Sequence, residues 1–189
     1  REAQGGGSGI DVAASTYGGI LLVRRQSDSL HCEPVRLPAG LRIHVLSEPR
    51  PASTQNFVAR VRALANDRPA EHRACLQRQA EASERAARAL LDGDADALLA
   101  ALAAQGEALL ALGLAANIPI FTEALAHLRP EAIRAGAALL PSGAGGGDLA
   151  LWVTRERAGE SPTTLPPETP ELPRLMLHLG APGVARVPD

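Results

Sequence analysis

The feature that most constrains the fold is a glycine-rich stretch at residues 142–148, because four of the five positions from 143 to 147 are glycine. A helix interior would not hold such a run, since each Gly costs about 1 kcal/mol relative to Ala. The short apolar runs on either side, residues 137–140 and 149–154, are therefore predicted to be strands. Together they predict two strands joined by a loop whose backbone can adopt positive φ repeatedly.

A loop with this many glycines favours an anion-binding nest, in which several backbone N–H groups point to one side and bind phosphate. A flexible hairpin turn is the alternative, although hairpins usually need fewer residues and fewer glycines. A Walker loop is excluded because no Gly-Lys-Ser/Thr follows, and a dinucleotide fingerprint because a strand follows rather than a helix. The residues of this predicted phosphate loop are Ser142, Gly143, Ala144, Gly145, Gly146, Gly147 and Asp148.

A second glycine-rich stretch, Gly-Gly-Gly-Ser-Gly-Ile-Asp at residues 5–11, leads into a predicted short helix at 11–16, which Gly18 and Gly19 end. Asp11 then lies beside the positive end of that helix, which favours its ionised form. Such a carboxylate near a phosphate site could accept a proton from an attacking hydroxyl, or hold magnesium. The alternative is that Asp11 serves only as a helix N-cap.

The middle of the chain is predicted to be helical. Phe57, Val58, Val61 and Leu64 share one helical face, with Ser53 or Thr54 as its cap. Further helices are expected at 69–91, 94–115, 119–128 (stopped by Pro130) and 172–179, and further strands at 20–23, 41–46 and 184–187. Strands near both ends with helices between them predict an α+β fold.

Composition excludes several classes of function. The net charge is −2 and the basic residues are spread along the chain, which argues against a nucleic-acid partner. Gln105, Gly106 and Glu107 interrupt the apolar run at 95–116, so a packed helix is expected rather than a membrane span. Cys32 and Cys75 form no CxxC pair, and the five histidines have no metal-ligand spacing, so we expect a cytoplasmic protein with reduced thiols and no metal-ligating residues of its own.

Three motifs, in this order, resemble those of the GHMP kinases, which include galactokinase and the homoserine, mevalonate and phosphomevalonate kinases. Residues 7–19 are similar to the family's aspartate-bearing segment, and Pro-Ala-Ser-Thr at 51–54 to the acceptor-side segment of phosphomevalonate kinases. Residues 142–148 are similar to the third, C-terminal glycine-rich motif. The resemblance covers about the first 155 residues and is closest to the phosphomevalonate branch.

The resemblance implies phosphoryl transfer from ATP, with Mg²⁺, to a small-molecule acceptor. Asp11 would be the catalytic base or would orient the acceptor. Ser8, Gly9, Ser53 and Thr54 would line the acceptor pocket, and residues 142–148 would support the nucleotide's phosphate loop. The implied architecture is the end of the kinase N-terminal domain at residues 1–35, followed by a ferredoxin-like C-terminal domain at 36–189.

One departure limits what this chain alone can do. The family's second motif, Pro-x-x-x-Gly-Leu-Gly-Ser-Ser-Ala, cradles the ATP phosphates and does not occur here. Because the chain also begins at Arg1 without a methionine, we expect a fragment that is not a competent kinase by itself. A phosphomevalonate kinase-like enzyme of isoprenoid synthesis, acting as a monomer or homodimer, is the preferred function. A mevalonate or sugar kinase of the same superfamily and a non-catalytic ligand-binding remnant are the alternatives.

Overall fold

The computed structural model describes residues 8–27, 29–48, 54–156, 165–167 and 169–184. The chain divides into two compact units. The first unit comprises Arg1–Leu37 and Leu177–Asp189, and the second comprises Pro38–Met176. The assignment of residues 1–35 and 36–189 to two kinase domains stays a prediction.

The described residues of the first unit form one short helix and a two-stranded hairpin. Helix α1 (Ile10–Tyr17) ends at Gly18, as expected from the paired glycines. Strands β1 (Ile20–Gln26) and β2 (Ser29–Val35) pair antiparallel from Ile20↔Val35 to Gln26↔Ser29. The sequence predicted the start of β1 but missed β2, because Glu33 and Pro34 obscure the alternation typical of a strand.

The segment at 177–184 returns to the end of α1 and completes the first unit. The backbone N–H of Gly19 donates to the carbonyl of Ala181 at 2.7 Å, and that of Val184 donates to the carbonyl of Ser15 at 3.2 Å. The two chain segments cross so closely that a Cβ added to Gly18 would lie 2.0 Å from the backbone nitrogen of Gly183. Glycine at position 18 is therefore required by packing as well as by its φ of +67°.

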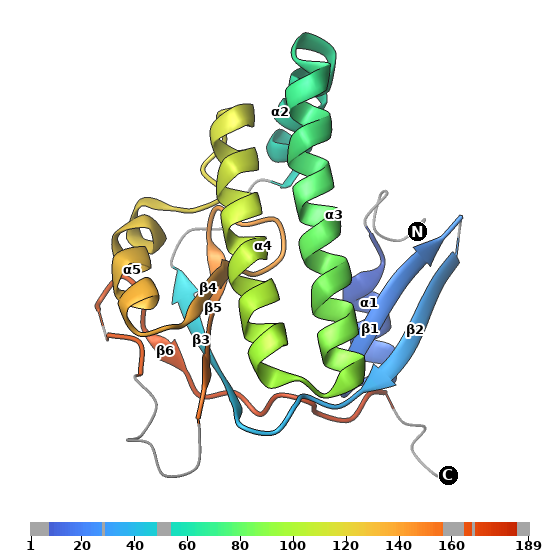
Figure 1. Cartoon of the computed structure of the whole chain (residues 1–189), viewed down its shortest axis with the longest axis vertical. Coiled ribbons are helices and arrows are strands. Elements are labelled where there is room, and N and C mark those ends of the chain that lie inside the picture. The colour runs from blue at the N-terminus through green and yellow to red at the C-terminus, as the bar shows by residue number, and fades with distance from the viewer. Residues whose placement is uncertain (1–7, 28, 49–53, 157–164, 168, 185–189) are drawn as a thin grey trace. The chain divides into compact units, whose positions relative to one another are not determined.

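The second unit is built on a four-stranded sheet of order β4-β5-β3-β6 in which every neighbouring pair is antiparallel (Figure 1). Strand β3 (Leu41–Glu48) pairs along its whole length with β5 (Asp148–Arg155), from Leu41↔Arg155 to Glu48↔Asp148. Strand β4 (Ala138–Pro141) forms one edge of the sheet, and the two-residue β6 (Arg174–Leu175) the other. Strands at 41–46, 137–140 and 149–154 were predicted, and the structure confirms them within one or two residues.

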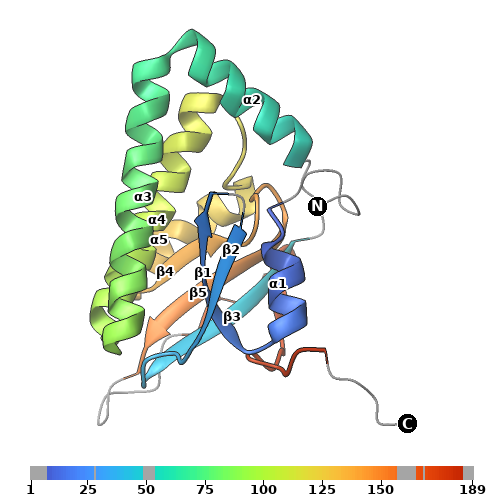
Figure 2. The ribbon, with the colours of Figure 1, turned by 90° about the vertical axis from the view of Figure 1, so that its right-hand side faces the viewer.

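Four helices lie between β3 and β4 in the sequence: α2 (Thr54–Asp67), α3 (Pro69–Asp92), α4 (Ala95–Ala116) and α5 (Glu123–Arg134). Helices α3 and α4 lie side by side as an antiparallel pair, and α2 runs at an angle to α3 (Figures 1 and 2). Gly93 ends α3 with a φ of +71°, and the carboxylate of Asp94 accepts a 2.9 Å hydrogen bond from the Ala97 N–H at the start of α4. These caps fix the turn between the two longest helices.

Helix α4 packs in the core of the second unit. Among the described residues, α4 is the one helix whose length and apolar composition would suffice to cross a membrane. Nine of its residues are buried, and it packs on α3 and on β4. The approach to β4 is close, since a Cβ on Gly106 would lie 2.8 Å from the carbonyl oxygen of Leu139. Beneath the helices, Trp152 of β5 is completely buried in the main core cluster.

One predicted helix is shifted along the chain, and another does not form. The helix expected at 119–128 instead begins at Glu123 after its N-cap Thr122, and it continues through Pro130 to Arg134. The helix expected at 172–179 does not form, because residues 174–175 pair with β3 as strand β6 and Leu172 is buried in the core. Of the strand expected at 184–187, only Val184 lies within the described residues, and it is not in a strand.

Candidate functional site

Residues 8–11 of the first glycine-rich stretch begin α1; residues 5–7 lie outside the described part of the chain. Gly9 occupies the N-cap position with a φ of +77°, a left-handed conformation that glycine adopts without strain. Asp11 follows in the first turn of α1 and is solvent-exposed. The positive end of the helix dipole favours an ionised carboxylate at this position. The structure therefore places Asp11 at the start of a helix, as the sequence predicted, but Gly9 rather than Asp11 is the N-cap.

Ser8 and Arg25 hold the chain that enters α1. The Ser8 hydroxyl oxygen accepts a 3.4 Å hydrogen bond from the Ile10 N–H, and the Ser8 carbonyl accepts one of 2.8 Å from the Arg25 guanidinium. This contact gives Arg25 a structural role, since it ties β1 to the segment that leads into Asp11.

The second glycine-rich stretch forms an ordered loop between β4 and β5, which we call the C-terminal glycine loop (residues 142–148). The Ser142 N–H donates to the Leu149 carbonyl at 2.8 Å and closes the base of the loop. Positive φ angles follow at Gly143, Gly145, Gly146, Gly147 and Asp148. Such a run needs glycine at nearly every position, which is why the sequence signal was so strong.

Much of this loop is packed against protein. The Gly146 N–H donates to the Ile120 carbonyl at 2.9 Å, and the Gly145 N–H donates to the Ser142 carbonyl at 3.4 Å. A Cβ on Gly145 would lie 2.6 Å from the Ile120 carbonyl oxygen. Among the described residues, the N–H groups of Gly143 and Ala144 have no hydrogen-bond acceptor. Only part of the loop is thus available as an anion nest, and the remainder fixes its shape.

The start of α2 lies against the same loop. A Cβ on Gly146 would lie 2.5 Å from Cζ of Phe57, which is one turn into α2. Thr54 is the first residue of α2 and is exposed, whereas Ser53 lies outside the described residues. A helix N-terminus and a glycine loop both favour negatively charged ligands. The structure therefore brings the α2 start and the C-terminal glycine loop together as one candidate anion site.

Sequence reasoning missed Glu48, a charged residue at the edge of this site. Glu48 ends β3 directly opposite Asp148, and only 8% of its surface is exposed. Its Oε1 atom is buried and has no hydrogen-bond partner among the residues that the structure describes. The signal in the sequence was an acidic residue on the face of β3 that also carries buried Leu46, two positions earlier.

Half-buried His44 lies on β3 opposite Trp152. Burial, and secondly the positive charges of Arg174 and Arg42, lower the pKa of His44 below its ordinary value of 6.5. Its Nε2 atom is buried, and no described residue forms a hydrogen bond with it. His44 is therefore held in its neutral form more strongly than an exposed histidine.

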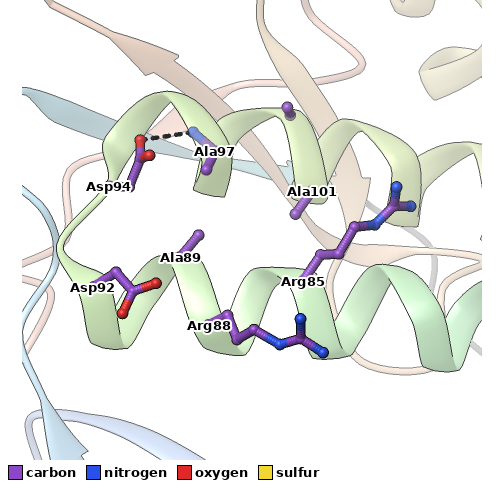
Figure 3. A pocket seen from close by; sticks show the side chains of 8 residues that line it. Arg85, Arg88, Ala89, Asp92, Asp94, Ala97 and Ala101 are labelled. Carbon is purple, nitrogen blue, oxygen red and sulfur yellow. Dashed lines mark hydrogen bonds between the residues drawn. The ribbon is translucent and has the colours of Figure 1, made fainter.

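A separate groove of about 360 Å³ opens between the end of α3 and the start of α4 (Figure 3). Its floor is made of alanines, and its rim carries two arginines and two aspartates: Arg85, Arg88, Asp92 and Asp94. The rim charges are of both signs, and Asp94 already caps α4. None of the predicted site residues lines this groove.

The predicted site residues fall into two groups. Ser8, Gly9 and Asp11 lie together in the first unit, and Thr54 and residues 142–148 lie in the second. The roles assigned to them from the resemblance stay predictions. Across the part of the chain that the structure describes, no group of three or more His, Cys, Asp or Glu residues is placed to hold a metal ion.

Comparison with known proteins extends the resemblance. No family model matches the chain. A curated phosphomevalonate kinase from Streptomyces sp. (strain CL190) is 28% identical over 166 residues, which cover 77% of this chain and 44% of that protein.

Three solved structures share the fold. A protein from Listeria innocua aligns with a TM-score of 0.74 and 24% identity, over 82% of this chain and 50% of that one. The L. major mevalonate kinase in complex with R-mevalonate aligns with a TM-score of 0.68 and 24% identity, over 80% of this chain and 45% of that one. The Streptococcus pneumoniae phosphomevalonate kinase in complex with phosphomevalonate and AMPPNP gives 0.56 and 19%, over 70% of this chain and 37% of that one.

The chain thus spans half or less of the length of each of these proteins. At 19–24% identity, the structural likeness establishes a shared mixed helix-and-sheet fold. Together with the curated relative, it confirms the resemblance to the C-terminal portion of GHMP kinases.

Proposed function

We propose that this chain, which resembles the C-terminal portion of GHMP kinases, forms part of an enzyme that transfers a phosphoryl group from ATP to a small-molecule acceptor. Phosphomevalonate is the preferred acceptor, because the curated relative is a phosphomevalonate kinase and the Pro-Ala-Ser-Thr segment at 51–54 resembles that branch. Mevalonate or a sugar, accepted by other members of the superfamily, is the alternative.

The observation that carries this proposal is the contact between the C-terminal glycine loop and the first turn of α2. Two anion-favouring elements converge there, and packing on Ile120 and Phe57 fixes their geometry. Phosphoryl transfer depends on positioning and charge stabilisation more than on covalent chemistry, so preorganised loops are the parts such an enzyme needs.

The chain's own residues would divide the work as follows. Asp11, exposed at the start of α1, would orient the acceptor or take its proton. Thr54, at the start of α2, would contact the acceptor. The C-terminal glycine loop would support the phosphate-binding loop of the nucleotide. Mg²⁺ bound with ATP would neutralise phosphate charge.

The test is a coupled assay of ATP turnover with the intact gene product and mevalonate, phosphomevalonate or a sugar as acceptor. We expect turnover with phosphomevalonate, and no turnover by the 189-residue chain alone. Turnover with only mevalonate or a sugar would reassign the acceptor, and turnover with none of them would refute a kinase role.

A non-catalytic ligand-binding module is the second candidate, favoured by one observation: these 189 residues contain no motif of the kind that cradles ATP phosphates. Calorimetric titration with ATP separates the two candidates. A kinase requires the intact gene product to bind ATP while the 189-residue chain binds it weakly or not at all. Absence of ATP binding by both would favour the non-catalytic module.

A further inference from the structure

We propose that the segment 177–184 positions Asp11 by holding the end of α1 in place. The segment lies far from α1 in the sequence but belongs to the same compact unit. The positioning role rests on the proposed function, in which Asp11 orients the acceptor or takes its proton. That the segment holds α1 does not depend on any activity and can be measured separately.

The first observation is that α1 has little to stabilise it locally. The helix is 8 residues long, well below the roughly 12–15 residues at which an isolated helix becomes marginally stable in water. Of its residues, only Ala13 is buried, and its N-cap residue, Gly9, has no side chain that could cap it. Contacts from outside the helix must therefore keep it folded.

At the start of α1, Arg25 supplies such a contact. Its guanidinium donates a 2.8 Å hydrogen bond to the carbonyl of Ser8, two residues before the helix begins. One hydrogen bond contributes about 0.5–1.5 kcal/mol, which is about the cost of ordering the backbone of a single residue. This anchor alone is therefore too weak to order the whole helix.

The end of α1 is held by backbone hydrogen bonds with the segment 177–184. The Gly19 N–H donates to the Ala181 carbonyl at 2.7 Å, and the Val184 N–H donates to the Ser15 carbonyl at 3.2 Å. The Ser15 carbonyl is one of the last four of the helix, which have no partner within the helix itself. The segment thus supplies a hydrogen bond that α1 cannot make on its own.

The crossing of the two chain segments has no spare room. A Cβ on Gly183 would lie 2.2 Å from the Thr16 carbonyl oxygen and 2.5 Å from the carbonyl carbon of Tyr17. Unlike Gly18, Gly183 does not have a positive φ, so this contact is what opposes an alanine there. The chain at Gly183 therefore lies directly against the last turn of α1.

Asp11 lies between these two anchors, in the first turn of a helix about 12 Å long. A helix held at both ends keeps one orientation, whereas a helix held only at its start can fray and take its side chains with it. A misplacement of about 1 Å can lower a reaction rate about 10²-fold. The segment 177–184 would thus act through Asp11, without touching the acceptor or the nucleotide.

Amide hydrogen exchange of the intact gene product tests whether the segment holds α1. In Gly183→Ala, the amides that donate to the Gly9 and Ala14 carbonyls should exchange at least about tenfold faster. The matched control Val184→Ala shortens a side chain of the same segment that is 81% exposed, so it should leave these amides unchanged. Unchanged exchange in Gly183→Ala, or an equal loss of protection in Val184→Ala, would overturn the proposal. Unchanged amides in β3 would confirm that the second unit remains folded.

Steady-state kinetics of the intact gene product tests the link to Asp11. Gly183→Ala should lower kcat about tenfold to hundredfold and leave the KM for ATP unchanged, because the predicted nucleotide-side loop lies in the second unit. In an Asp11→Asn background the same substitution should have little further effect, since the segment then has no reactive group to position. An equally large loss of kcat in that background would overturn the positioning role. If no variant turns over any acceptor, the proposed function fails, whereas the exchange experiment still decides whether the segment holds α1.

Discussion

The two glycine-rich stretches look alike in sequence, yet the structure uses them differently. In the first unit, Gly9 lets the chain enter α1 and leaves Asp11 exposed. In the second unit, Gly145 and Gly146 are needed because Ile120 and Phe57 occupy the space that a side chain would fill. The first stretch leaves a carboxylate exposed at the start of a helix, whereas the second fixes the shape of a loop. Glycine content alone therefore indicates where a chain turns, and the neighbours of each glycine indicate why.

The largest expected effect is on turnover, and it tests whether the first glycine-rich stretch positions Asp11 for catalysis. Replacing Asp11 with Asn in the intact gene product should lower the turnover number by about 10²–10⁴-fold, as expected for loss of a positioned base. Steady-state kinetics with ATP and phosphomevalonate would measure the effect, and circular dichroism would confirm folding. Unchanged turnover would restrict Asp11 to a role in the first turn of α1, where Gly9 is the N-cap.

A substitution within the C-terminal glycine loop tests its packing role. Gly145→Ala should lower the free energy of unfolding by about 3 kcal/mol, because the new methyl group meets the Ile120 carbonyl and the φ of +74° is strained for alanine. Gly143→Ala is the matched control, since it shares a positive φ but has nothing within 4 Å. It should cost about 1 kcal/mol. Urea denaturation followed by Trp152 fluorescence would measure both, and equal costs would refute the packing argument.

An equivalent pair of variants exists in the first unit. A methyl group at Gly18 would collide with the backbone at 182–183, whereas one at Gly19 has nothing within 4 Å. We expect Gly18→Ala to displace the segment 177–184 and to lower the free energy of unfolding by about 2 kcal/mol. The loss should not be larger, because it cannot exceed the energy with which that segment packs on the first unit. Hydrogen exchange of the Gly19 and Val184 amides would report the displacement. Retained protection in Gly18→Ala, or equal loss in Gly19→Ala, would argue against the close crossing.

The smallest expected effect is a dependence of stability on pH, and it involves only the second unit. The pKa of His44 is lowered in the folded state, mainly by burial, so the unfolded chain takes up the proton first as the pH falls below about 6.5. Stability should therefore decrease between pH 6.5 and the lowered pKa of folded His44, and this dependence should be weaker in His44→Gln. Urea midpoints across this range would measure the difference. Parallel curves for the two proteins would contradict it.

Local sequence patterns predicted most of the fold. The caps at Asp94 and Gly93, and the apolar periodicity of α2, α3 and α4, are local signals, and the structure confirms those helices. The errors occur where contacts between residues far apart in the sequence determine the secondary structure. Strand β2 forms because β1 lies beside it, and residues 174–175 form a strand because β3 offers an edge. Pro130 is tolerated inside α5, whose buried Leu125, Leu128 and Ala132 anchor the helix in the core.

In the candidate site, too, the sequence revealed features that depend on neighbouring residues and missed contacts between residues far apart in the chain. The glycine loop and the positions of Asp11 and Thr54 at helix starts were visible in the sequence. The contact of Phe57 with Gly146 and the pairing of Glu48 with Asp148 were not, because each joins residues some 90 to 100 positions apart. Sequence reasoning therefore found the anion-favouring groups and missed the carboxylate beside them.

The single tryptophan and the single tyrosine of the chain lie in different units. Trp152 is fully buried in the second unit, and Tyr17 is exposed at the end of α1 in the first. Each unit thus contains its own natural chromophore, and excitation at wavelengths that only indole absorbs would follow the second unit alone. Whether the units melt together or one after the other can consequently be observed without attaching any label.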